Sequence, residues 1–106
     1  MPFDVTSGVT EGVARITLSG ELDAGSASRF KQSIESVLPA SPKRLVLFTK
    51  DLTFMASAGL RVLIFARQKL GDDVTIVVVA PQESILDTLQ KTGFHHSVQV
   101  VASYPD

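Results

Sequence analysis

Hydrophobic residues along this 106-residue chain change their spacing several times, and each change marks an expected element. Apolar and polar residues alternate over 13–18, and with the segment 3–6 they predict two strands joined by a turn. From about residue 24 to 38 the apolar positions recur at intervals of three and four, which predicts a helix. We expect Asp23 to cap the start of this helix and Pro39 to end it.

Two short runs of continuous hydrophobic residues, 45–48 and 74–79, follow further along the chain. Runs of this kind are typical of parallel strands that are covered on both faces of a sheet. A helix is expected between them over 57–70. After the second run the pattern predicts a helix over 82–91 and a last strand over 98–101.

The element order β-β-α-β-α-β-α-β predicts an α/β fold with a mixed, mostly parallel β-sheet packed by helices. A chain of this length is expected to form a single domain over residues 1–106. Its content of 44% hydrophobic and 20% charged residues is typical of a globular protein rather than a disordered one.

Composition and charge argue against several functional classes. Ten Lys and Arg against eleven Asp and Glu give a formal net charge of -1, whereas nucleic-acid binding needs a basic stripe. The chain has no cysteine, which removes disulfides and thiolate metal sites and fits a reducing compartment. No signal-peptide pattern follows Met1, and the longest apolar run, 76–81, is too short to span a bilayer. We therefore expect a cytoplasmic protein without membrane insertion.

Ser57 is the candidate functional residue, because it lies at the expected start of a helix with only small residues beside it. These neighbours are Ala56, Ala58 and Gly59. Backbone N–H groups at a helix start are unpaired and carry partial positive charge, so they favour an anion or a phosphate. Arg61, four residues further on, could stabilise a phosphate on Ser57. The residues alone also allow the commoner interpretation, in which Ser57 only caps the helix.

The same helix is expected to have an apolar face and a narrow polar strip. The apolar face, which should pack on the sheet, consists of Gly59, Val62, Leu63, Ala66 and Leu70. Ser57, Arg61 and Gln68 lie on the opposite side. Ile64 and Phe65 flank this polar strip, and such a mixed surface is typical of a protein–protein contact. Both could equally be residues at the edge of the core, since single exposed apolar residues are common.

Three motifs in this order resemble those of STAS domains, specifically of the bacterial anti-sigma factor antagonists. Residues 51–60, DLTFMASAGL, resemble their signature, which reads roughly D-L-S/T-x-V/F-x-D-S-S-G-L between a strand and a helix. Residues 18–23, LSGELD, resemble the family's G-E-L-D segment before the first helix. Residues 91–94, KTGF, resemble its S/T-G-L/F segment after the last conserved helix. The resemblance covers nearly the whole chain and implies a STAS fold.

The resemblance also implies a mechanism called partner switching. An unmodified antagonist binds a serine-kinase anti-sigma factor and so releases a sigma factor. The kinase uses ATP to phosphorylate the antagonist, which breaks the complex, and a protein serine phosphatase resets it. In this chain the implied phosphoacceptor is Ser57, and no metal or cofactor is implied. The resemblance also implies that Asp23 lies near the kinase-binding surface and that the helix after Ser57 forms part of it. Together with the surface pattern of this helix, it leads us to expect partner contacts at Asp23, Ala56, Ser57, Ala58, Gly59, Arg61, Ile64 and Phe65.

Two residues of the signature depart from the family pattern. Ala56 stands where the family usually has Asp, and Ala58 replaces the second Ser. The first change removes a negative charge beside a phosphate on Ser57, and the second leaves Ser57 as the one acceptor in the motif. An alternative function therefore remains: a STAS protein-binding module of a transporter complex or a signalling scaffold, which is not phosphorylated.

Catalysis is not expected of this chain. The G-x-S-x-G elbow of serine hydrolases is absent, because Met55 stands at the position of its first glycine. His95 and His96 are adjacent, so in an extended segment they would point to opposite faces, and they lack nearby partners at metal-ligand spacing. We interpret them as loop residues. Asp72 and Asp73 follow the expected end of a helix and indicate a turn.

Overall fold

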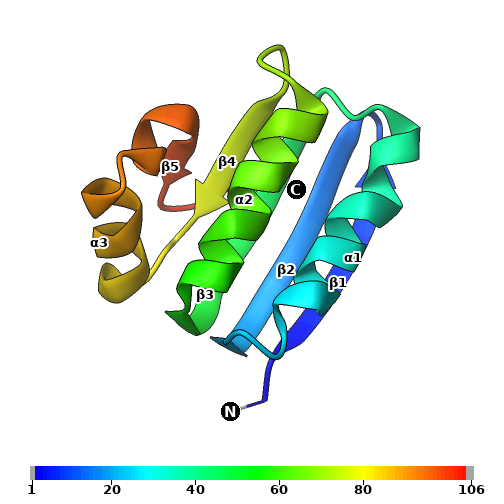
Figure 1. Cartoon of the computed structure of the whole chain (residues 1–106). Helices are drawn as coiled ribbons and strands as arrows, with labels where there is room; N and C mark the ends of the chain where they lie inside the picture. The colour runs from blue at the N-terminus through cyan, green and yellow to red at the C-terminus, as the bar shows by residue number, and fades with distance from the viewer. Residues whose placement is uncertain (1, 105–106) are drawn as a thin grey trace.

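The computed structural model describes residues 2–104, which form a five-stranded sheet with helices on one of its faces (Figure 1). Its elements are β1 Asp4–Thr10, β2 Val13–Leu22, α1 Ala27–Val37, η1 Leu38–Ala40, β3 Arg44–Met55, α2 Ser57–Leu70, β4 Thr75–Val79, α3 Glu83–Lys91, η2 Phe94–Ser97 and β5 Gln99–Val101. The strands lie in chain order, with β1 antiparallel to β2 and the other neighbours parallel. This confirms the expected α/β class and element order.

Helices α1, α2 and α3 all pack on the same face of the sheet, so the cover expected over the other face of β3 and β4 is not helical. Each parallel connection moves one strand along the sheet in the same direction, and right-handed crossovers then place every helix on one side. The main core lies between this face and the helices. Its largest fully buried side chains include Phe30, Ile16, Leu22, Leu47 and Ile76.

The opposite face of β3 and β4 is buried without a helix. Val46 and Val77 lie in a small apolar cluster there, against which Phe48 and Tyr104 pack. The rings of Phe48 and Tyr104 meet edge to face with 6.4 Å between their centroids. Arg44 donates a hydrogen bond from Nη1 to the Tyr104 hydroxyl at 2.8 Å. The C-terminal segment therefore takes the place of the expected second layer.

Several element bounds differ from the sequence-based expectation. Helix α1 begins at Ala27 and ends at Val37, and Pro39 lies in the short η1 turn that follows. Strand β3 was expected to end at residue 48 but continues to Met55, so the first half of the signature motif is strand. Helix α2 spans the expected residues, and Gly71 ends it with a positive φ of 82°.

An irregular pairing between β2 and β3 directs the chain into α2. Thr17 pairs with Phe48 but Leu22 pairs with Met55, so β3 has two extra residues opposite β2. One lies between the partners of Thr17 and Ser19, and the other forms a bulge between Leu52 and Phe54. The bulge lets Leu52 and Met55 both point into the core although they are three residues apart. The Thr53 hydroxyl donates to the carbonyl oxygen of Gly20 at 3.1 Å across this bulge. As a result β2 and β3 end together, next to the start of α2.

Candidate partner-binding site at the start of helix α2

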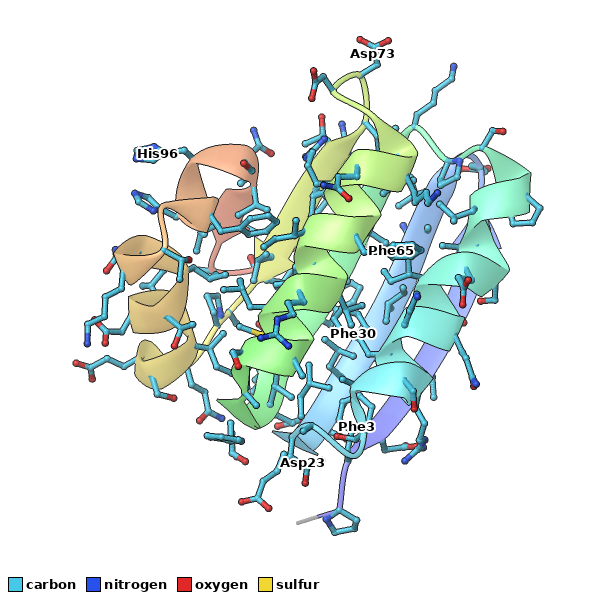
Figure 2. All side chains as sticks on the ribbon, viewed as in Figure 1. Phe3, Asp23, Phe30, Phe65, Asp73 and His96 are labelled. Carbon is cyan, nitrogen blue, oxygen red and sulfur yellow. The ribbon has the colours of Figure 1, made fainter. Side chains whose placement is uncertain are left out.

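The ends of β2 and β3 bring two distant parts of the sequence to one edge of the molecule. The N–H of Ala56 donates to the carbonyl oxygen of Leu22 at 2.8 Å, so the residues after each strand are neighbours. Gly59 permits this approach, because a Cβ atom there would lie only 2.8 Å from Cδ2 of Leu22. Figure 2 shows Asp23 at the same end of the structure as the start of α2. The fold thus places Asp23 near Ser57.

Ser57 is the first residue of α2, and it is not the cap. Ala56 is the N-cap, with φ -75° and ψ 167°, and its carbonyl oxygen accepts from the N–H groups of Gly59 and Leu60. The Ser57 side chain is exposed and its hydroxyl has no hydrogen-bond partner within residues 2–104. The interpretation of Ser57 as a capping side chain is therefore wrong. Its hydroxyl is free to be read or modified by another protein.

The exposed side of α2 agrees with the expected pattern. Ser57, Arg61 and Gln68 are exposed, whereas Gly59, Leu60, Val62, Leu63 and Ala66 are buried. Arg61 lies one turn after Ser57 and forms no ion pair with any residue of the described range. A phosphate on Ser57 would therefore meet a cation that has no competing partner.

The two apolar residues that flank the polar strip differ in their burial. Ile64 is 40% exposed, which makes it an available apolar contact. Phe65 is half-buried and packs against the core, in the space between α1 and α2 (Figure 2). The structure therefore makes Ile64 a surface residue and Phe65 a residue at the edge of the core.

Asp23 has a different local role from the expected one. It does not cap α1, whose N-cap is Ser26, but closes the turn that precedes the helix. One carboxylate oxygen, Oδ1, accepts from the Ser26 N–H and from the Ser26 hydroxyl, each at 2.9 Å. These two hydrogen bonds favour the charged carboxylate and lower the pKa of Asp23 from its ordinary value, the hydroxyl having the larger effect. The turn thus presents an exposed, ionised carboxylate beside the start of α2.

Replacement Ser26→Ala is expected to raise the pKa of Asp23 back toward its ordinary value, because it removes the hydroxyl that stabilises the charged form. With its pKa depressed in the folded state, Asp23 stabilises the fold above the pKa of a free aspartate, about 4. This contribution is lost as the pH falls through the lowered folded-state pKa. Carboxyl chemical shifts measured by NMR across the acid range test the prediction. The same midpoint in wild type and variant would contradict it.

Phe54 is a surface residue near Ser57 that the sequence analysis missed. Its side chain is 48% exposed, and it lies in β3 three residues before Ser57. The strand was expected to end at residue 48. The sequence pattern was therefore not used to predict on which face of the sheet Phe54 lies. The available signal was an aromatic residue within the signature motif itself. Its neighbour Met55 points into the core under the helices, so Phe54 is an exposed apolar side chain on the other side of the sheet.

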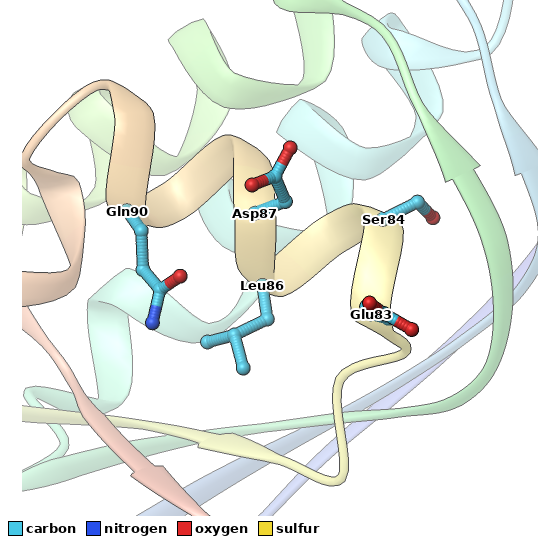
Figure 3. A pocket seen from close by; sticks show the side chains of 5 residues that line it. All are labelled: Glu83, Ser84, Leu86, Asp87 and Gln90. Carbon is cyan, nitrogen blue, oxygen red and sulfur yellow. The ribbon is translucent and has the colours of Figure 1, made fainter.

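The remaining candidates do not build a second chemical site. His95 and His96 lie in η2 rather than in an extended segment, and their ring centroids are 3.9 Å apart. No group of metal-binding side chains occurs within the described residues. An open hollow of about 610 Å³ on α3 is lined by Glu83, Ser84, Leu86, Asp87 and Gln90 (Figure 3), none of them a predicted site residue. Between residues 2 and 104, no helix is long and apolar enough to cross a bilayer.

Comparisons of the sequence with known proteins all indicate the same family. The model of the STAS domain matches residues 5–106. The anti-sigma-F factor antagonist RsfB of Mycobacterium tuberculosis is 33% identical over 81 residues, which are 74% of this chain. The chain spans 66% of the length of RsfB.

Solved structures agree with this result. An anti-sigma factor antagonist from Mycobacterium paratuberculosis superposes with a TM-score of 0.86 at 26% identity, over 96% of this chain and 87% of that one. Unphosphorylated SpoIIAA has the same fold, with a TM-score of 0.73 at 17% identity, over 97% of this chain and 90% of that one. The chain belongs to the STAS domain family, and within that family it is similar to anti-sigma factor antagonists.

Proposed function

We propose that this protein is an anti-sigma factor antagonist that acts by partner switching. In its unphosphorylated form it binds a serine-kinase anti-sigma factor and so releases a sigma factor. The kinase uses ATP to phosphorylate Ser57, which breaks the complex, and a protein serine phosphatase restores the binding form. The site works in the cytoplasm and contacts neither nucleic acid nor a membrane.

The observation that carries this proposal is the free hydroxyl of Ser57 at the first position of α2. The hydroxyl is exposed and has no hydrogen-bond partner among the described residues, so a kinase does not need to break a contact to reach it. The start of α2 and Arg61 both favour a phosphate there. SpoIIAA of Bacillus, which has the same fold with a TM-score of 0.71 at 19% identity, is known in a phosphorylated form.

Ala56 in place of the family aspartate is compatible with this role. Ala56 is the N-cap of α2 and makes no side-chain capping bond. An aspartate at this position would offer its own carboxylate to the helix N–H groups and would repel a phosphate. With alanine, a phosphate on Ser57 meets the helix dipole and Arg61 without an acidic neighbour in the motif. We therefore expect a phosphate on Ser57 to be repelled less than it would be with the aspartate at position 56, with Asp23 as the carboxylate that remains beside the start of α2.

Phosphorylation tests the proposal directly. Each serine-kinase anti-sigma factor of the source organism is purified and incubated with the chain, ATP and Mg²⁺, and the product is weighed by intact mass spectrometry. We expect one phosphate, which Ser57→Ala abolishes. Ser84→Ala is the matched control, because Ser84 is also an exposed serine in the first turn of a helix, α3. This variant should still accept one phosphate.

The second candidate function is a constitutive STAS binding module in a transporter complex or a signalling scaffold. The absence of the family aspartate at position 56 favours it. This alternative predicts no phosphate with any of the kinases, and binding to a partner that ATP does not disturb. A phosphate on Ser57 that dissociates an anti-sigma factor would exclude it.

A further inference from the structure

Positive charge is concentrated on the two helices that lie side by side over the sheet, α1 and α2 (Figure 1). Their basic residues are Arg29, Lys31, Arg61, Arg67 and Lys69, and their one acidic residue is Glu35. The whole chain, by contrast, has a formal net charge of -1. The charges of this protein are therefore unevenly distributed, and the surface of α1 and α2 is positive.

Two of these five basic residues are bound to oxygen atoms of the fold. Arg29 lies 3.6 Å from the carboxylate of Asp4 and donates to the carbonyl oxygen of Phe3. Arg67 donates to backbone carbonyl oxygens, including those of Val74 and Ser97. Within the described part of the chain, Lys31, Arg61 and Lys69 form no ion pair. These three residues are called the cationic cluster below.

The cationic cluster is organised around the ring of Phe65. The ammonium nitrogens of Lys31 and Lys69 lie 4.8 Å and 5.8 Å from the centre of this ring. Arg61 precedes Phe65 by one turn of α2, and Ser57 precedes Arg61 by one more. One row along the helix thus begins with the phosphoacceptor and continues through a cation, an aromatic ring and a second cation. Lys31 completes the group from α1.

The chemistry of this surface selects the kind of partner. Three free cations are fewer than a nucleic acid or a membrane surface usually recruits. They surround a half-buried aromatic ring and lie next to the exposed Ile64, which is the mixture of charge and apolar area found at protein interfaces. Glu35, four residues after Lys31, forms no ion pair there within the described residues. Carboxylate groups on a protein surface are therefore the fitting complement.

We propose that the cationic cluster binds an acidic surface of the anti-sigma factor, and that phosphate on Ser57 releases this partner by reducing the cluster's charge. The proposal rests on the proposed function of the chain. A phosphoserine carries about two negative charges near neutral pH, so the phosphate and the three cations together carry about one positive charge. The effect is weaker on Lys69, which lies three helical turns from Ser57, because surface charges are screened over about 10 Å. Arg61 is the nearest of them, one turn away. The anti-sigma factor is then released for two reasons: the cationic cluster attracts it less strongly, and the phosphate blocks its contact with Ser57.

The test reverses the charge of the cluster in the double variant Lys31→Glu and Lys69→Glu. The probe is the purified anti-sigma factor of the source organism that binds the wild-type chain, with its dissociation constant measured by titration calorimetry. We expect binding to weaken by about tenfold or more at low ionic strength, with most of the loss in the association rate. The difference from wild type should shrink at high ionic strength, where surface charges are screened.

The matched control is the double variant Lys43→Glu and Lys50→Glu, which makes the same charge change at exposed lysines outside α1 and α2. It should bind within about twofold of wild type. The neutral variant Lys31→Gln and Lys69→Gln, which avoids new repulsion between helix residues, should give an intermediate loss. Melting temperatures of all variants show whether any of them is unfolded.

The outcomes separate the two proposals. If no anti-sigma factor binds the wild-type chain, the proposed function itself fails, and this inference fails with it. If binding is released by phosphorylation of Ser57 but both double variants at Lys31 and Lys69 bind like wild type, only the present inference is overturned. It is also overturned if the wild-type chain binds phosphatidylglycerol vesicles through these lysines and the anti-sigma factor without them.

Discussion

Replacement of Ser57 by glutamate is expected to weaken binding of the anti-sigma factor by roughly a hundredfold, equivalent to about 3 kcal/mol. The carboxylate imitates part of the charge of a phosphate at the first position of α2. A partner that covers this position must remove the charge from water, which costs free energy. The measurement is a titration of the purified anti-sigma factor with wild-type and Ser57→Glu chains.

Two controls assign this effect to the charge at this position. Ser57→Gln has the size of glutamate without its charge, and it should cost far less binding. Ser84→Glu introduces the same charge in the first turn of α3 and should leave binding intact. Unchanged affinity of the Ser57→Glu chain, with its melting temperature preserved, would mean that the start of α2 is not covered by the partner.

Replacement of Gly59 by valine is expected to lower the free energy of unfolding by about 3 kcal/mol. Gly59 is buried in the first turn of α2, where a Cβ atom would lie 2.8 Å from Cδ2 of Leu22 and 2.9 Å from Cγ of Met55. Both neighbours are core side chains, and Leu22 is fully buried, so neither can move away freely. A β-branched side chain must therefore push α2 away from the ends of β2 and β3.

Chemical denaturation monitored by circular dichroism measures this loss. Gln68→Val is the control, because Gln68 is exposed on the same helix and receives the same β-branched side chain without a collision. Its cost should stay within the helix-propensity difference, below about 1 kcal/mol. Equal stability of the two variants would show that the contact of Gly59 with Leu22 and Met55 is not restrictive. A displaced α2 should also weaken partner binding, since Ser57 would lose its position relative to Asp23.

The hydrophobic pattern predicted helix α2 to the residue. Its buried and exposed positions follow the 3.6-residue period without interruption, and Gly71 stops it. Strand β3 was predicted too short, because β3 past residue 48 carries polar residues such as Lys50 and Asp51, and a bulge interrupts its alternation. A bulge is a mismatch in the number of residues between two paired strands, so the hydrophobic pattern of one strand does not reveal it. For the same reason the exposed Phe54 was missed.

Asp23 shows a second limit of local reasoning. An acidic residue before a helical pattern is usually its cap, but here the chain makes a full turn first, and Ser26 begins the helix. The hydrogen bonds from Ser26 to the Asp23 carboxylate stabilise the turn and lower the pKa of Asp23. The local sequence is compatible both with Asp23 as the helix cap and with Asp23 in a turn before the helix. Packing of Ala27 and Phe30 into the core selects the one observed.

The sequence alone determined the elements, their order and the hydroxyl at the start of α2, because periodicity and short motifs are properties of neighbouring residues. Only the tertiary structure decided what surrounds that hydroxyl. Parallel pairing of β2 with β3 brings Asp23 to Ser57, and packing of α1 on α2 brings Lys31 to Phe65. These contacts join residues far apart in the chain, and they form because burying the apolar faces of sheet and helices allows one arrangement of the elements.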